Sequence, residues 1–164
     1  MPRFPRAVAD NPGGGGRGNT VWILQSFHEA GVQGALLGIF FDPALAEESH
    51  RLGIGATFHA QFNRFENHPL SGKFAADAVV EALHDGNMVG ARGRHFGGPW
   101  HCPRPLALLR VVGIHVVVVS VRQQCKVTAM YEVFGINIAK ARSLIVKPAG
   151  IFAQRSTCCF PTIE

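Results

Sequence analysis

The segment GALLGIFFD, residues 34–42, is apolar without interruption until its final aspartate. A strand with one face in solvent alternates apolar and polar residues, whereas a strand covered on both faces is apolar throughout. The segment is also much shorter than the roughly 20 apolar residues of a membrane-spanning helix. It therefore predicts an inner strand of a sheet that is covered on both faces, which is typical of an α/β fold.

A helix is predicted on each side of this strand. Before it, NTVWILQSFHEAG has Asn19 or Thr20 to cap the first N–H groups of a helix and Gly31 to end it. After it, Pro43 stands at the first position of a helix that ends at Gly53. Because RAVAD near the start of the chain reads as a short strand, we expect the chain to begin with a βαβ arrangement.

The remainder of the sequence reads mainly as strands. ATFHAQFNRF (residues 56–65) and KFAADAVVEALHDGNMVG (residues 73–90) alternate in part, and Asp85-Gly86 within the second is typical of a tight hairpin turn. LALLRVVGIHVVVVSVR predicts two strands that meet near Val112-Gly113, CKVTAMYEVFGI predicts a helix, and SLIVKP predicts a last strand. The predicted class is α/β, or mixed α+β, with a βαβ start, a partly parallel sheet, helices packed on it and an antiparallel strand insertion.

Composition and charge narrow the possible partners. Hydrophobic residues make up 47% of the 164 residues and charged residues 16%, which indicates a globular chain. The formal net charge is +5, but the basic residues are scattered and no aromatic residues alternate with them, so no nucleic-acid partner is predicted. The sequence shows neither a membrane-length apolar run nor the apolar core of a secretory signal. We therefore expect a cytoplasmic protein without a membrane partner.

The segment VADNPGGGGRGNT places four consecutive glycines between the predicted first strand and the helix after it. Bare N–H groups and the positive end of a helix dipole can hold a carboxylate or another anion. The segment lacks the Lys-Ser/Thr pair of a P-loop, and a flexible surface loop is an equal alternative. The candidate ligand-binding residues of this loop are Asp10, Asn11, Gly13, Gly14 and Gly15.

Two interpretations are open for Asp10 and Asn11 in particular. Their side chains could orient the glycine loop or touch a substrate. They could instead satisfy nearby backbone donors, as aspartate and asparagine commonly do in turns.

A second group of polar residues, Arg122, Gln123 and Gln124, follows the most apolar predicted strand. In α/β sheets, ligands bind beyond the carboxyl ends of the strands. Arg122 could clamp a carboxylate with two hydrogen bonds, and the glutamines could bind a peptide or amide group. The alternative is that Arg122 pairs with a surface carboxylate and that the glutamines face solvent.

The sequence predicts no metal site within this chain. The best cluster of potential ligands is HFGGPWHC, with His95, His101 and Cys102, but its glycines and proline indicate a loop rather than a rigid ligand face. The four cysteines lack CxxC spacing, and no nucleophile motif is present. No catalytic residue, metal ligand or cofactor is therefore predicted in this chain.

Several segments resemble, in order, the C-terminal domain of the MlrC (microcystinase C)-like zinc metallopeptidases. They are VADNPGGGGRGNT, FDPALAEESHRLGIGATF, HDGNMVG, GRHFGGP, ALLRVVGIHVVVVSVRQQC and MYEVFGINIAKARSLIVK. The resemblance covers roughly residues 7–147, and residues 1–147 are expected to form a single domain. It implies hydrolysis of a peptide or amide bond by zinc-activated water in the complete enzyme. It also implies that the zinc ligands and the catalytic acid/base belong to an N-terminal domain.

The resemblance implies that this chain is the non-metal-binding C-terminal domain, detached from the catalytic domain. Its expected partners are a missing N-terminal metal-binding domain or a separately encoded one, a peptide-like substrate in the complete enzyme, and a second copy in a homo-oligomer. Residues 148–164 depart from the family, with Pro148 in place of a serine and Ile151 in place of a histidine, and are expected to be a divergent tail. The alternative hypothesis is a small-anion or phosphate-binding α/β module that uses the glycine loop.

Overall fold

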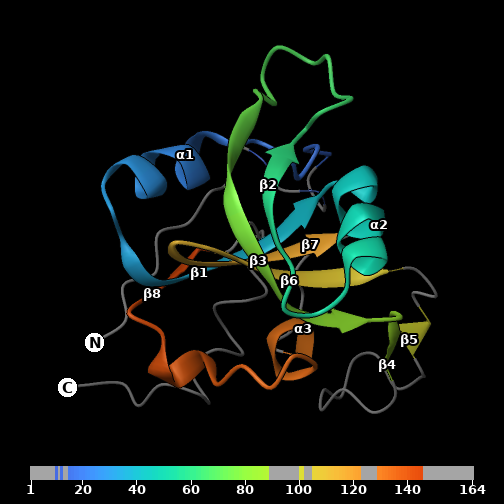
Figure 1. Ribbon diagram of the computed structural model, residues 1–164. Helices are drawn as coiled ribbons and strands as arrows, with labels where there is room; N and C mark the ends of the chain where they lie inside the picture. The colour runs from blue at the N-terminus through green and yellow to red at the C-terminus, as the bar shows by residue number, and fades with distance from the viewer. Residues whose placement is uncertain are drawn as a thin grey trace.

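A six-stranded mixed sheet lies at the centre of the molecule, with the strand order β2-β3-β6-β7-β1-β8 (Figure 1). The structure is a computed structural model that describes residues 10, 12, 15–88, 100–101, 105–122 and 129–145. Its elements are α1 (Trp22–Glu29), β1 (Gln33–Phe41), α2 (Pro43–Leu52), β2 (Thr57–Phe62), β3 (Phe74–His84), β4 (Asn87–Met88), β5 (Trp100–His101), β6 (Leu106–Val111), β7 (Gly113–Val119), α3 (Ala129–Glu132), a 3-10 helix η3 (Ile138–Lys140) and β8 (Ser143–Ile145).

The sheet combines a parallel part with an antiparallel part. β1 pairs in parallel with β7 on one side and with β8 on the other. β2, β3, β6 and β7 form an antiparallel series. The strands β2, β3 and β6 come between β1 and β7 in the chain, so they are the predicted antiparallel insertion in a partly parallel sheet. The predicted fold class is therefore confirmed. The predicted opening strand covers residues 6–10, of which only Asp10 lies in the described part of the chain.

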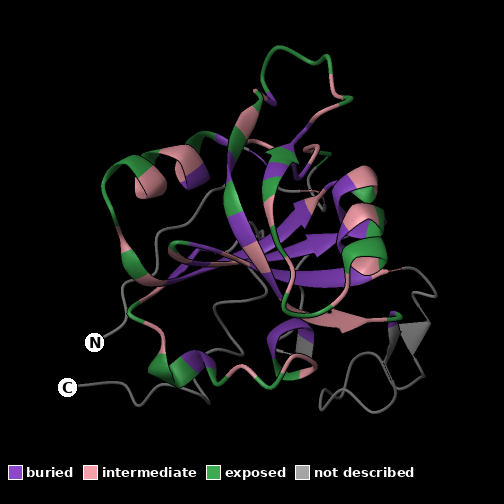
Figure 2. Cartoon of the chain, viewed as in Figure 1, coloured by how far each residue is buried: buried purple, intermediate pink, exposed green. Residues whose placement is uncertain are grey.

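Both faces of the sheet are covered, as the unbroken apolar run of β1 predicted. One core cluster contains Val21 just before α1, Leu24 on α1 and Leu45 on α2, packed against alternate residues of the strands. The other contains Met130 and Tyr131 on α3 and Ile138 on η3. Figure 2 shows the buried strands between these two layers. Successive residues of the inner strands point to opposite faces, so both sets must be apolar.

The boundaries of the helices confirm most of the local predictions. Pro43 begins α2 after Asp42, whose carboxylate accepts a hydrogen bond from the backbone N–H of Leu45, and the helix ends before Gly53. Gly31 follows the C-cap of α1 in the left-handed region, with φ of +62°. The predicted helix over CKVTAMYEVFGI is helical only at α3 among its described residues.

The predicted cap of α1 is wrong. The residue before the helix is Val21, which has no capping side chain. Asn19 and Thr20 lie earlier and use their side chains elsewhere: the Thr20 hydroxyl donates to Asp10, and the Asn19 amide donates to Glu66. Hydrogen bonds to residues distant in the sequence therefore engage the two side chains that were expected to cap α1.

The predicted hairpin at Asp85-Gly86 is also wrong. β4, which follows this turn, pairs with β5 in a separate two-stranded sheet and not with β3. At its end β3 pairs with β6, since His84 lies opposite Leu106. The Gly86 N–H donates to His84 Nδ1 at 2.9 Å, so a side chain directs the chain out of the large sheet. The predicted turn at Val112-Gly113 does connect β6 and β7.

Candidate functional site

The carboxyl ends of β1 and β7 form the candidate site. The two strands run in parallel, and the N–H of Asp42 donates to the carbonyl of Val119 at 3.0 Å where they end. Polar residues follow both strands: Asp42 after β1, and Ser120 and Arg122 after β7. In open α/β sheets this edge is the usual place for a ligand.

The glycine loop lies against this edge. The backbone N–H of Phe41, the last residue of β1, donates to the carbonyl of Gly18 at 3.0 Å. Gly18 has φ of +77°, and a Cβ there would come within 2.7 Å of the Pro12 ring. Both conditions require glycine at this position. The third candidate glycine of the loop, Gly15, also has a left-handed backbone, with φ of +88°.

Asp10 organises the loop from inside. Its buried carboxylate accepts hydrogen bonds from the N–H of Gly18 at 2.7 Å, from the N–H of Thr20 at 2.8 Å and from the Thr20 hydroxyl at 2.8 Å. These contacts agree with the turn interpretation of Asp10. They also mean that the loop holds an anion, and that this anion is a side chain of the same protein. Asn11, Gly13 and Gly14 lie outside the described residues.

Arg122 reaches the same edge from β7. Its guanidinium carbon lies 5.5 Å from the centre of the Phe41 ring, and its side chain is exposed. Among the described residues, no carboxylate forms an ion pair with it. A cation held over an aromatic face is positioned yet free to bind an anion from solvent. Gln123 and Gln124 fall outside the described part of the chain.

The structure therefore brings together those predicted residues that it describes. Asp10 binds Gly18, Gly18 binds Phe41, and Phe41 lies beneath Arg122. These contacts place the glycine loop and the residues after β7 along one edge, although they are more than a hundred residues apart in the sequence.

Sequence reasoning missed Asn63, which holds this edge together. Its backbone is left-handed, with φ of +60°, and its N–H donates to Asp42 Oδ2 at 2.7 Å. Its side-chain amide donates to the carbonyls of Asn19 at 2.6 Å and Gly72 at 2.8 Å. An asparagine directly after a strand was the available signal, because asparagine tolerates left-handed backbone better than most residues.

Asp42 carries an electrostatic cost at this position. Burial raises the pKa of its carboxyl, while hydrogen bonds from Asn63 and Leu45 and the charge of Arg64 act in the opposite direction. The backbone N–H groups of Asn63 and Leu45 replace hydrogen bonds that water would otherwise donate to the carboxylate. Asp42 thus links the start of α2 to the loop after β2.

Glu66 ties the glycine loop to the loop between β2 and β3. Its carboxylate pairs with Arg17 and accepts hydrogen bonds from the Asn19 amide and the N–H groups of Asn67 and His68. The Arg17 hydrogen bond is the largest cause, and together these groups lower the pKa of Glu66 to about 2.

Replacing Glu66 with glutamine is expected to make stability less dependent on pH under acid conditions. The carboxyl titrates near 4.5 when unpaired and near 2 in the fold, so its contribution is present above pH 4.5 and disappears as the pH falls toward 2. Urea unfolding should show wild type more stable than Glu66→Gln by about 1 kcal/mol at neutral pH, allowing for solvent screening, with convergence in acid. A difference that stays constant between about pH 6 and pH 3 would contradict this assignment.

A hollow of about 290 Å³ opens beside this network. Its walls come from the end of β1, the start of α2, the glycine loop and the loop after β2. It is lined by Asn19, Phe41, Asp42, Pro43, Ala44, Asn63, Phe65 and Glu66. Its size suits one side chain of a ligand rather than a whole cofactor.

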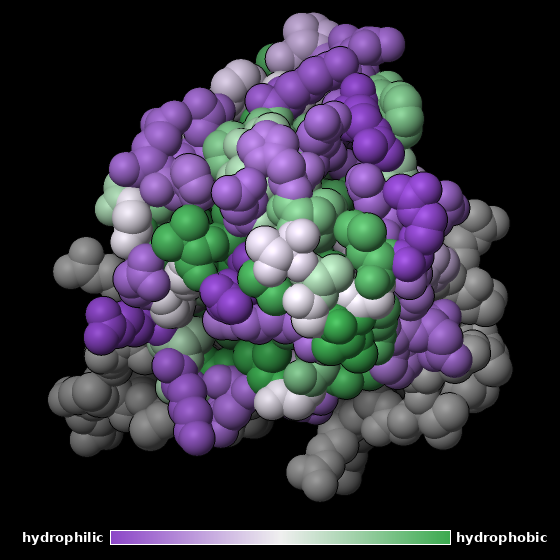
Figure 3. Space-filling model, in the orientation of Figure 1, coloured by the Kyte–Doolittle hydropathy of each residue, from purple (hydrophilic) through white to green (hydrophobic). Residues whose placement is uncertain are grey.

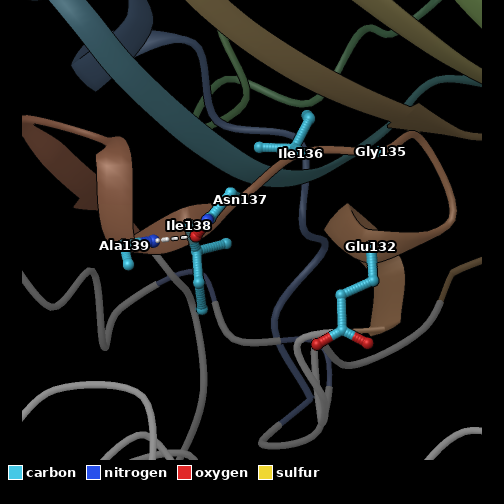
Figure 4. Close-up of a pocket in the computed structure, with 6 residues that line it drawn as sticks. All are labelled: Glu132, Gly135, Ile136, Asn137, Ile138 and Ala139. Atoms are coloured by element: carbon cyan, nitrogen blue, oxygen red, sulfur yellow. Dashed lines mark hydrogen bonds between the residues drawn. The ribbon is translucent and has the colours of Figure 1, made fainter.

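A larger hollow, of about 450 Å³, lies on the face of α3 and η3 (Figure 4). Its polar side chains are Glu132 and Asn137, and Asn137 accepts a hydrogen bond from the N–H of Ala139. In Figure 4 the Glu132 side chain extends away from Ile136. Among the described residues, these two are the only polar side chains that line this hollow, so we do not take it as the candidate site.

The described residues do not fit a zinc site. Among them, no three histidine, cysteine, aspartate or glutamate side chains gather where one ion could bind all of them. His95 and Cys102 lie outside the described residues, and His101 is described only as part of β5. His59 instead lies 2.9 Å from an Asp77 carboxylate oxygen on the exposed face of the sheet.

Comparisons with known proteins agree with the fold. The crystal structure of a "putative metallopeptidase" from Mesorhizobium sp. BNC1 superposes with a TM-score of 0.79 at 17% sequence identity. The match covers 99% of this chain and 33% of that protein, so this chain spans about a third of its relative. At this identity the likeness shows a shared fold. No curated protein matches the chain. None of the helices in the described ranges is long and apolar enough to cross a membrane.

The family described as MlrC C-terminus matches residues 7–157, nearly the whole sequence. The sequence resemblance to this family is therefore confirmed, whereas the predicted domain boundary at Lys147 stays a prediction. The chain belongs to the MlrC C-terminus family.

Proposed function

We propose that this chain is the C-terminal domain of an MlrC-like zinc metallopeptidase. We further propose that the edge of the sheet at the carboxyl ends of β1 and β7, called the carboxyl edge below, forms one wall of the peptide-binding cleft. The observation that carries this proposal is the convergence of the glycine loop, the end of β1 and Arg122 on one edge of the sheet. Membership of the family and the fold shared with a metallopeptidase support it.

In this proposal the chain binds and orients the substrate and does not supply the metal. Zinc bound by the N-terminal domain, or by a separately encoded partner, would activate water for attack on a peptide or amide carbonyl. Arg122, held over Phe41, would bind a substrate carboxylate. The hollow lined by Phe41, Asn63 and Phe65 would receive a neighbouring side chain.

The alternative phosphate-binding function has less support. A phosphate cradle needs unpaired N–H groups that point at the ligand. The N–H groups of Gly18 and Thr20 already donate to Asp10, and that of Val21 donates to the carbonyl of Ser71. We therefore favour the peptide-binding wall.

Titration with short peptides that have a free C-terminal carboxylate is expected to shift backbone amide resonances of the chain at the carboxyl edge, around Gly18, Phe41 and Arg122. Arg122→Ala should weaken binding about tenfold, because a charge-assisted bidentate pair is lost. Arg142→Ala is the matched control. Arg142 is equally exposed but lies beside Gly34, at the opposite edge of the parallel strands, so its removal should leave the affinity unchanged.

Two results would contradict the proposal. The first is a set of shifts that appears at the Arg142 edge or is unaffected by Arg122→Ala. The second is chelator-sensitive peptide hydrolysis by the purified chain alone, since that would place the complete metal site within it.

A further inference from the structure

β2 forms one outer edge of the large sheet. It pairs with β3 without a break in register, from Thr57 opposite Val79 to Phe62 opposite Phe74. Within the described residues no strand pairs with its other side. Figure 1 shows β2 in front of β3, on the side of the sheet that carries neither β1 nor β8.

The backbone groups that β2 presents outward can be identified from its pairing. Val80 directs both its N–H and its carbonyl toward the start of β2. Antiparallel strands alternate between inward and outward groups, so Thr57, His59 and Gln61 point their N–H and carbonyl groups away from β3. Their side chains are also exposed. The outer edge thus offers a regular ladder of hydrogen-bonding groups that no strand in the described ranges occupies.

From Thr57 to Phe62 this edge lacks the usual features that prevent strand pairing, and its one irregularity lies before the strand, where Gly55 and Ala56 both bond to Val80. Natural edge strands are commonly protected by proline, lysine, an inward-pointing charge or a bulge. The strand TFHAQF contains none of these residues, and its register with β3 is regular. The strand contains no arginine, aspartate or glutamate either.

Exposed apolar residues flank the strand at both ends. Ile54, before β2, is 68% exposed, and Phe65, after it, is 73% exposed. Beside Phe65 lies a hollow of about 260 Å³ that is also lined by Arg64 and by Glu47, Glu48 and Arg51 of α2. In Figure 3, apolar and neutral residues gather across the middle of the face on which Figure 1 shows β2 and β3, and hydrophilic residues surround them.

We propose that two copies of this chain associate through antiparallel pairing of β2 with the partner's β2. Centred on His59, this pairing sets Thr57 opposite the partner's Gln61, so that the outward groups of both strands are joined. Ile54 lies in the turn just before β2 and Phe65 in the turn just after it, so antiparallel pairing brings Ile54 beside the end of the partner's β2, toward the partner's Phe65. The hollow beside the partner's Phe65 can then receive Ile54.

The charges on α2 agree with this arrangement. Arg51, in the last turn of the helix, and Glu47, one turn earlier, line the same hollow and therefore face the β2 side of the molecule. A two-fold axis through β2 reverses one helix relative to the other, which turns the partner's Arg51 toward Glu47; within its own chain Arg51 lies 3.7 Å from Glu48 at the surface. The Asp77 carboxylate lies 2.9 Å from His59 in each copy, so each of the two histidines that meet has an acidic neighbour in its own chain. The surface is therefore self-complementary in hydrogen bonding, apolar contact and charge, independently of peptide binding by Arg122.

Sedimentation equilibrium of the purified chain is expected to give the mass of a dimer at micromolar concentrations. Ile54→Asp should raise the dimer Kd about tenfold or more, because it replaces an apolar contact with a charge. Val112→Asp is the matched control: Val112 is 53% exposed on the turn between β6 and β7, two strands across the sheet from β2, and its replacement should leave the Kd unchanged.

Hydrogen exchange provides the second measurement. In the dimer, the amides of Thr57, His59 and Gln61 should be protected, and this protection should be lost on dilution or in Ile54→Asp. The proposal is overturned if the wild-type chain has the mass of a monomer at about 200 µM, far above the Kd of a specific interface. It is also overturned if Ile54→Asp and Val112→Asp weaken the dimer equally, or if the three β2 amides exchange freely in a dimer.

Discussion

Replacing Asp10 with alanine is expected to lower the free energy of unfolding by about 3 kcal/mol or more. The Asp10 carboxylate is buried and accepts three hydrogen bonds from Gly18 and Thr20. Alanine leaves these donors without an acceptor, and each buried unpaired donor costs about 1–3 kcal/mol. Chemical denaturation at neutral pH measures the loss. Asp10→Asn should recover only part of the lost free energy. The asparagine side chain keeps one acceptor oxygen, and its NH2 group would face backbone or hydroxyl donors of Gly18 or Thr20.

Asp77→Ala is the matched control for this substitution. The carboxylate of Asp77 also has a partner, His59, but both residues lie on the surface and Asp77 is highly exposed. Its removal should change the free energy of unfolding by no more than about 0.5 kcal/mol. If Asp10→Ala costs no more than Asp77→Ala, then Asp10 does not organise the glycine loop.

The second large effect is expected at Gly38, in the middle of β1. A Cβ on this residue would lie 2.1 Å from the Tyr131 hydroxyl oxygen and 3.1 Å from the carbonyl oxygen of Ile145. Tyr131 is almost fully buried and cannot easily move away. Gly38→Ala should therefore destabilise the fold by about 3 kcal/mol, the upper part of the range for overpacking a core. Thermal or urea unfolding measures this loss.

A double-mutant cycle identifies the cause. Tyr131→Phe removes the hydroxyl group that meets the new methyl group, so Gly38→Ala should cost roughly 1 kcal/mol less in the Tyr131→Phe background. Gly113→Ala is the control, because the three atoms nearest to its Cβ would all belong to the flexible and exposed end of the Gln33 side chain. Equal costs for Gly38→Ala and Gly113→Ala would show that the contact with Tyr131 does not determine the choice of glycine.

Much of the fold followed from short-range patterns. The unbroken apolar run predicted the inner strand β1, Pro43 and Gly53 marked the ends of α2, and Val112-Gly113 marked the turn between β6 and β7. These features depend on burial and on backbone preferences that neighbouring residues set. The family resemblance added the order of the motifs, which the family match confirmed.

The errors occurred where distant partners compete with local preferences. Asn19 is a good capping residue, yet its side-chain NH2 donates to Glu66 and its side-chain oxygen accepts from the Ser71 hydroxyl, 52 residues away. Asp85-Gly86 is a good hairpin turn, yet the next strand pairs with β5. A local pattern shows which conformations have a low free energy for that segment, and tertiary contacts determine which of them the folded chain adopts.

By itself, the sequence determined that the chain forms an α/β sheet covered on both faces, because the spacing of apolar residues and the positions of glycine and proline act over a few residues. Only the tertiary structure decided that Asp10 fills the glycine loop, that Asn63 holds Asp42, and that Arg122 lies over Phe41. These contacts join residues that are distant in the chain, and their geometry depends on strand order and register, which no local pattern specifies.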